Sequence, residues 1–212
     1  MLINSYRFLP PVPFDVSIGS GTTNKPEYPC YQFYDYGYFG FIYKNSELNL
    51  TSTVSITGMR FQMGESGGTE SMNNQTVKLA QVNQDEFDIN IRNDFTQVPL
   101  QPTPWIANNI TTVKTGFTWT VVNNPPTYTE IIFTTPFTYN PNDSTYPHLL
   151  IIWEQEDGSY NSGSSTPWAE CFTDASKTRS YYDYADNNMP PTTDYGTRDS
   201  TGIPNVQFIC QY

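Results

Sequence analysis

Few residues in this sequence could carry acid–base catalysis. A hydrolytic triad needs a base beside its nucleophile, and that base is usually histidine. The chain has a single histidine, His148, which follows Pro147 at the start of the apolar run HLLIIW. We interpret His148 as a structural residue at the edge of a strand. The HExxH, P-loop and GxGxxG patterns are absent from the sequence.

Carboxylates are the second source of possible chemistry. Glu154, Glu156 and Asp157 flank a turn, and Asp183 and Asp186 lie near the last hairpin. A glycosidase needs two such groups facing each other, roughly 5 to 10 Å apart. Acidic residues are ordinary at turns, so we predict no enzymatic activity, no catalytic residue, no cofactor and no metal site. Calcium held by scattered oxygen ligands is the alternative.

Aromatic side chains are the main candidates for binding, at 16% of the chain. Exposed Trp and Tyr rings offer rigid area with a polar tip, and they bind sugars or partner proteins. Aromatic residues also dominate protein cores, so each could instead be structural. The predicted ligand-binding residues are Trp105, in a Pro-rich stretch, and Trp168, Tyr181, Tyr182 and Tyr184.

The elements that position these residues are predicted to be strands. Aromatic and β-branched residues prevail over Ala and Leu, which are the best helix formers. The chain carries 17 Pro and 13 Gly, which mark many turns. Its 212 residues suit one all-β domain. We predict an all-β fold, an antiparallel β-sandwich of jelly-roll-like form.

Hydrophobic alternation locates the individual strands. In residues 52–63 the apolar parity changes at Gly58, which predicts a β-bulge there. The run 148–153 is apolar on both faces and predicts a central strand that is covered on both sides. Residues 115–122 and 129–135 are expected to pair across a short loop. Further strands are expected in 31–44, 75–82, 176–186 and 205–212.

Residues 1–28 are predicted to form an extended Pro/Gly-rich arm before a sandwich domain at 29–212. Tyr6, Phe8 and Phe14 are candidate assembly residues that would dock this arm on another chain. A loose tail is the alternative. Because the edges of a sandwich must be covered, we expect the arm along one edge, or contacts between copies in a homo-oligomer.

Charge and cysteine content narrow the partners. The net charge of -11 disfavours binding to nucleic acid or to anionic membranes. Cys30, Cys171 and Cys210 are expected to be buried free thiols, with a Cys171–Cys210 bridge as the alternative. The N-terminal sequence lacks the features of a secretory signal. No apolar run approaches the ~20 residues that span a membrane, so no membrane insertion is expected.

A series of short motifs covers most of residues 40–210. The motifs are SEL (46–48), SITGMRFQM (55–63), MNNQTVKL (72–79), TPFTYN (135–140), LLIIWEQEDGSY (149–160), Cys171, TRSYYDYADN (178–187) and PNVQF (204–208). In this order they resemble an extracellular β-sandwich module that is frequent in large secreted and surface proteins of Bacteroidetes. Here the loop before LLIIW is longer than in that family. The resemblance implies a sandwich used in adhesion or as a structural spacer, with no catalytic residue.

A surface-type module without an export signal is expected in a bacteriophage virion, whose proteins fold in the host cytoplasm and leave the cell at lysis. We therefore predict a decoration, head-fibre or tail adhesion subunit. Its partners would be other virion proteins, reached through the arm, and a host-surface glycan. The alternative is an extracellular module of the bacterial cell surface that serves adhesion or carbohydrate binding.

Overall fold

The computed structural model describes residues 11–64, 69–87, 107–122, 127–160, 168–190 and 197–212. Within these ranges the chain is built almost wholly from strands. One short helix, α1 (Asn45–Leu48), follows the third strand. The strands are β1 (Phe14–Ile18), β2 (Thr23–Lys25), β3 (Tyr36–Tyr43), β4 (Val54–Met63), β5 (Thr69–Val82), β6 (Ala107–Val122), β7 (Thr127–Tyr139), β8 (His148–Glu156), β9 (Ala169–Phe172), β10 (Ser180–Ala185), β11 (Thr197–Asp199), β12 (Ile203–Pro204) and β13 (Val206–Gln211).

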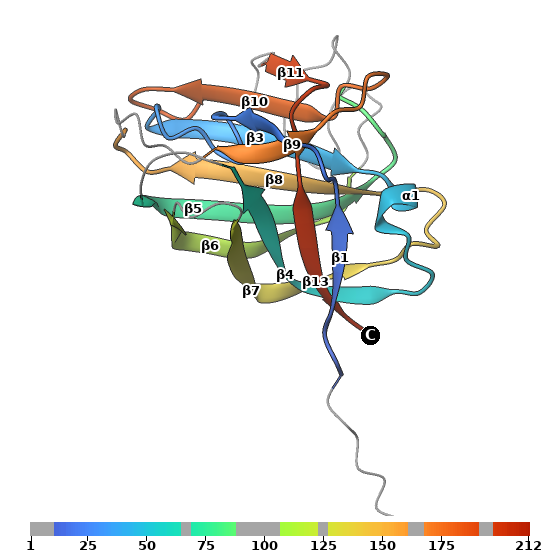
Figure 1. Ribbon diagram of the computed structural model, residues 1–212. Helices are drawn as coiled ribbons and strands as arrows, with labels where there is room; N and C mark the ends of the chain where they lie inside the picture. The colour runs from blue at the N-terminus through green and yellow to red at the C-terminus, as the bar shows by residue number, and fades with distance from the viewer. Residues whose placement is uncertain (1–10, 65–68, 88–106, 123–126, 161–167, 191–196) are drawn as a thin grey trace, which may run out of the picture.

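The strands form two antiparallel sheets packed against each other. The first sheet has the order β1-β13-β4-β9-β12, with β7 paired to β4 and β2 paired to β9. The second has the order β11-β10-β3-β8-β5-β6. In Figure 1, β4, β13 and β1 cross in front of the strands of the second sheet. The predicted all-β antiparallel sandwich is confirmed.

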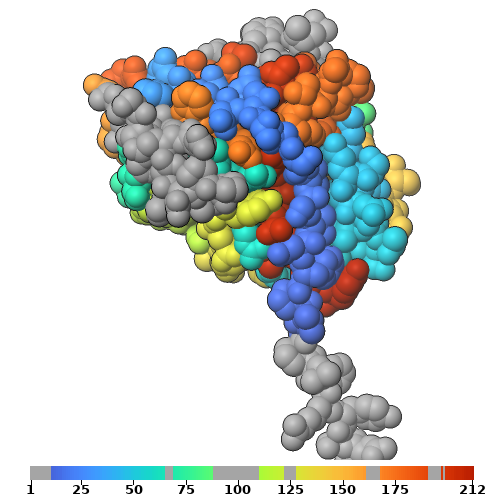
Figure 2. All heavy atoms as spheres, viewed as in Figure 1, coloured from blue at the N-terminus to red at the C-terminus, as the bar shows by residue number. Residues whose placement is uncertain are grey.

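Part of the predicted arm belongs to the sandwich. Residues Phe14–Ile18 pair with β13, and Thr23–Lys25 pair with β9. The sandwich therefore starts at Phe14 and not at residue 29, because Phe14, Val16 and Ile18 alternate toward the core. This strand lies along an edge of its sheet, as expected for the arm, and runs over the surface beside the C-terminal strand (Figure 2). Tyr6 and Phe8 lie outside the described residues.

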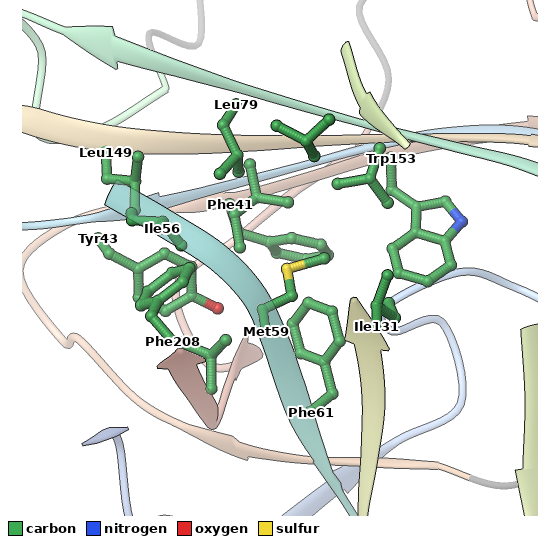
Figure 3. Close-up of a cluster of buried hydrophobic side chains, with 14 of the residues drawn as sticks. Phe41, Tyr43, Ile56, Met59, Phe61, Leu79, Ile131, Leu149, Trp153 and Phe208 are labelled. Carbon is green, nitrogen blue, oxygen red and sulfur yellow. The ribbon is translucent and has the colours of Figure 1, made fainter. Parts of the chain in front are cut away.

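The core fills the space between the two sheets (Figure 3). Trp153 of β8 is fully buried at its centre, and its indole N–H donates to Oε1 of Gln75 at 2.6 Å. Burial of such aromatic and aliphatic groups is the dominant favourable term in folding. The buried residues labelled in Figure 3 are Phe41, Tyr43, Leu79, Leu149 and Trp153 from the second sheet and Ile56, Met59, Phe61, Ile131 and Phe208 from the first.

The β-bulge predicted at Gly58 is present in β4. The register with β7 shifts between Ile56 and Gly58, and the register with β13 shifts between Ile209 and Cys210. Ile56 and Met59 lie on opposite parities of the sequence, yet both are fully buried. The extra residue therefore returns both halves of the strand to the same face.

Strand β8 is central and covered on both faces, as its sequence predicted. Leu149, Ile151 and Trp153 belong to the main core between the sheets. Leu150 and Ile152 point the other way into a second apolar cluster, on the outer face of the second sheet. The other buried members of this cluster are Ile42, Ala80, Val82, Phe87 and Tyr181.

The expected pairing of residues 115–122 with 129–135 is wrong. Strand β6 pairs with β5 in the second sheet, whereas β7 pairs with β4 in the first. The two strands contact each other through hydrogen bonds from side chains to backbone carbonyls. Lys114 Nζ donates to the Ile132 carbonyl at 2.8 Å, and Thr134 Oγ1 donates to the Val113 carbonyl at 3.0 Å. Pro136 lies on β7 where the ladder to β4 is interrupted, as expected for proline in an edge strand.

Cys30, Cys171 and Cys210 are buried and unbridged, in agreement with the expected free thiols. Burial raises the pKa of all three thiols, that of Cys210 to about 12. The thiols therefore stay protonated at neutral pH, which makes them poor nucleophiles.

Among the described residues, no helix has the length and apolar character needed to cross a membrane.

Replacing Phe61 with alanine tests the core. Phe61 is fully buried and contacts the rings of Phe41 and Trp153. We expect Phe61→Ala to lower the free energy of unfolding by about 3 to 5 kcal/mol, measured by urea denaturation. The matched control is Tyr128→Ala, because Tyr128 is 45% exposed. An equal loss of stability in both variants would contradict the packing described here.

Candidate functional site

His148 lies at the junction of α1 and β8. Its Nδ1 accepts a hydrogen bond from the backbone N–H of Asn45 at 3.3 Å, so it fastens the start of α1 to the start of β8. Burial lowers the pKa of His148, and the neighbouring Lys44 adds to this effect. The imidazole is therefore neutral at pH 7 and serves as an acceptor.

One Gly-x-Ser-x-Gly spacing occurs in the chain, at residues 64–68. In hydrolases this spacing forms a sharp turn from a strand into a helix, which exposes the serine. Here the segment joins two strands, β4 and β5, and residues 65–68 lie outside the described part of the chain. The flanking elements therefore do not match that arrangement.

The carboxylates predicted near the turn are held by polar partners. Glu154 forms an ion pair with Lys78. Glu154 and Asp183 lie on the outer face of the second sheet, two strands apart, with Tyr38 between them in register. Asp157 accepts the Asn73 N–H at 2.7 Å. Over the described residues, no group of three His, Cys, Asp or Glu side chains could hold a metal ion.

A buried ionic network joins two of the short motifs. The guanidinium of Arg179, from TRSYY, is fully buried and donates to both carboxylate oxygens of Glu47, from SEL, at 2.7 and 2.9 Å. The guanidinium also lies 5.3 Å from the Phe172 ring centre. Asp174 bridges Arg179 and Lys44. Burial by itself would raise the pKa of Asp174, but hydrogen bonds from Lys44 and Ser176 lower it to about 2.

Asn205, in the motif PNVQF, is a second buried structural residue. Its side chain accepts from the Gly21 N–H at 3.2 Å and donates to the Gly21 carbonyl at 2.7 Å. Its backbone bonds to Gln62 of β4 and Glu170 of β9. Asn205 therefore joins the segment before β2 to the middle of the first sheet. Glu47, Arg179 and Asn205, one from each of three motifs, are thus scaffold residues.

The structure separates the five predicted binding residues. Trp105 lies outside the described residues. Trp168 is 37% exposed at the start of β9. Tyr181 is only 3% exposed and packs against Phe87 on the outer face of the second sheet, so it cannot serve as a platform. Tyr182 and Tyr184 lie together on the opposite face, with parallel rings 5.7 Å apart.

Tyr182 and Tyr184 join residues that the sequence had not indicated. Tyr34 packs on Tyr184 with ring centres 4.0 Å apart, and Tyr31 contacts the same ring at 4.9 Å. We call Tyr31, Tyr34, Tyr182 and Tyr184 the tyrosine cluster. All four rings are partly exposed. Buried Tyr28 extends the cluster through an edge contact with Tyr182 at 5.7 Å.

A buried glutamine of β8 holds the tyrosine cluster in place. The side chain of Gln155 is fully buried and accepts the Tyr31 N–H at 3.0 Å. Its amide group donates to the carbonyls of Tyr31 and Tyr34. Gln155 thereby clamps the turn that carries two of the four rings onto the central strand.

The chemistry of the tyrosine cluster is that of neutral hydroxyls. Burial, followed by the neighbouring Tyr34 and Tyr182, raises the pKa of Tyr184 to about 12. Burial also raises the pKa of Tyr31 and of Tyr182, and the nearby carboxylate of Glu27 adds to both. These hydroxyls can donate or accept hydrogen bonds at pH 7. This is the candidate site.

Comparison with models of known protein families, with curated proteins and with solved structures gives no match.

The strand expected in residues 176–186 is present as β10 (Ser180–Ala185). The sequence indicated Tyr182 and Tyr184 because they lie close together in the chain. No comparable signal identified Tyr31 and Tyr34, because they meet Tyr184 only through a long-range contact. Their dense aromatic surroundings in YQFYDYGYFGFIYK predicted a strand, and the structure places both before the start of β3.

Removing one member of the buried ionic network should be costly. We expect Glu47→Gln to lower the free energy of unfolding by about 3 to 5 kcal/mol, because the buried Arg179 loses the carboxylate that it contacts through two hydrogen bonds and keeps only the longer contact with Asp174. Urea denaturation measures this loss. The double variant Glu47→Leu with Arg179→Met removes both charges and should lose less than the single variant. A larger loss in the double variant would show that the ion pair itself is strongly stabilising.

Because the chain has one histidine, its titration can be followed without ambiguity by NMR. We expect His148 to titrate below its ordinary pKa of 6.5. The unfolded chain then takes up this proton at higher pH than the folded chain does. The contribution of His148 to stability is complete above pH 6.5 and falls as the pH drops. His148→Gln should remove this part of the pH dependence, and a midpoint above 6.5 would contradict the burial described here.

Proposed function

We propose that this chain is a non-enzymatic structural and adhesion subunit, a component of a bacteriophage virion that displays its β-sandwich through contacts made by the N-terminal segment. The observation that carries the proposal is the edge formed by β1. It is the outermost strand of the first sheet in the described strand order. An outermost strand leaves backbone groups available for pairing with another chain.

Apolar side chains gather where the chain enters this edge. Val12 is 79% exposed and Tyr212 is 71% exposed. Tyr212 stacks on Phe14, the first residue of β1, with ring centres 4.8 Å apart. Exposed apolar residues beside an open strand are typical of a contact between subunits. Of the predicted assembly residues, Phe14 belongs to this N-terminal edge.

The virion setting is supported by the resemblance to surface-adhesin modules and by the scaffold role of the motif residues. Glu47, Arg179 and Asn205 maintain the sandwich, which leaves the loops and outer faces for recognition. The second candidate, a cell-surface or carbohydrate-binding adhesion module, is favoured by the tyrosine cluster. The two functions share the same scaffold and differ in what the N-terminal segment contacts.

Light scattering on the full chain, beside a variant lacking residues 1–12, tests the assembly proposal. The deletion stops before Phe14, so β1 keeps its pairing with β13. We expect the full chain to form a defined oligomer and the deletion variant to be monomeric. Cooperative urea unfolding of the deletion variant serves as the control that its fold is intact. Equal masses for both proteins would refute assembly through the N-terminal segment.

A further inference from the structure

Four buried polar atoms in the segment 27–35 have no hydrogen-bond partner among the described residues. They are Glu27 Oε2, the Tyr28 hydroxyl, Gln32 Oε1 and Asp35 Oδ1. Tyr28 is fully buried and Gln32 is 3% exposed, so neither can meet a ligand at the surface, whereas Glu27 and Asp35 are partly exposed. Leaving such an atom unpaired is unfavourable because its desolvation is not compensated, and native proteins have few such atoms. Their concentration in nine residues calls for an explanation specific to this segment.

These atoms share one chemical preference. The carboxylate oxygens of Glu27 and Asp35 and the amide oxygen of Gln32 are acceptors, and the Tyr28 hydroxyl can accept as well. A ligand that reaches the partly exposed carboxylates of Glu27 and Asp35 must bring hydrogen-bond donors or positive charge. The net charge of -11 argues against an anion. The choice is therefore between a cation and a neutral molecule rich in hydroxyl groups.

The tyrosine cluster favours a neutral molecule rich in hydroxyl groups over a cation. Calcium takes six to eight oxygen ligands, and no metal-ligating group of three side chains is found among the described residues. The segment 27–35 instead supplies aromatic rings beside its acceptors, with Tyr31 and Tyr34 in the same stretch. A sugar ring presents apolar C–H faces together with hydroxyl donors, and it matches a surface that combines aromatic rings with a few polar groups.

The surface is also held rigid. Gln155 fixes the backbone of Tyr31 and Tyr34, and the packed rings of Tyr182 and Tyr184 support them from β10. On the other side, Lys25 of β2 pairs with Asp199 at 3.0 Å, two residues before Glu27. A preorganised surface loses little conformational entropy when it binds.

We propose that the tyrosine cluster and the partly exposed carboxylates of Glu27 and Asp35, Glu27 foremost, form a binding surface for neutral saccharides. Tyr31, Tyr34 and Tyr184 supply aromatic contact and hydroxyls, and Glu27 accepts hydrogen bonds from sugar hydroxyls. This site goes beyond assembly through the N-terminal edge and does not depend on it. Trp168, which belonged to the predicted set, is not required.

Isothermal titration calorimetry with a panel of soluble neutral oligosaccharides (glucans, galactans, mannans and xylans) tests the site. We expect at least one to bind the full chain with a Kd between about 10 µM and 1 mM. Glu27→Gln, which keeps the size of the side chain, and Tyr34→Ala should each weaken binding about tenfold or more. Tyr128→Ala, on the exposed face of β7, should leave it unchanged.

Thermal unfolding of each variant verifies that it is folded before the titration is interpreted. A flat titration across the panel overturns the proposal, and so does binding that Glu27→Gln and Tyr34→Ala leave intact. A rise in unfolding temperature on adding calcium alone, abolished by Glu27→Gln, would assign the acceptors to a cation instead. Repeating the titration on the variant lacking residues 1–12 separates this test from the assembly test, because saccharide binding should persist there.

Discussion

Burial of β8 on both faces is the constraint on which the rest of the molecule depends. Its inward side chains need the first sheet, and its outward side chains need the second apolar cluster. A polar group on such a strand has no water to bond with, so it must find a protein partner. Gln155 finds that partner in the turn of Tyr31 and Tyr34. The packing of the core thereby determines where the candidate site stands.

The same logic explains the short motifs. Glu47 and Arg179 come from segments far apart in the chain, and together they join α1 to the segment before β10 through a buried pair. Asn205 joins three segments of the first sheet. Such residues can hold a sandwich together while its loops differ. They provide hydrogen bonds to backbone groups and pair the charged groups inside the scaffold. A sequence resemblance at these three residues therefore indicates the fold more strongly than it indicates the ligand.

Local patterns predicted the features that are local. The parity change at Gly58 identified the bulge, and the apolar run of β8 identified the central strand, because burial acts on neighbouring residues in each case. The partners of β6 and β7 were not predictable, since alternating strands fit either sheet equally well. Strand β1 was not predicted, because it lies in a Pro/Gly-rich segment that is typical of an extended arm. Residues 27–35 contact β10 over a long distance in the sequence. Such a contact produces no periodic pattern from which it could be predicted.

The pairing of β1 with β13 has a mechanical consequence. The two strands are antiparallel, and Phe14 at the start of β1 lies opposite Cys210 near the end of β13 (Figure 1). A force that separates these two ends would open the hydrogen bonds of the pair one after another, like a zipper. A force applied between the start of β1 and the start of β13, which lie at opposite ends of the pair, would instead load those bonds together, in shear. The pair therefore resists a pull along its length better than a pull that separates Phe14 from Cys210.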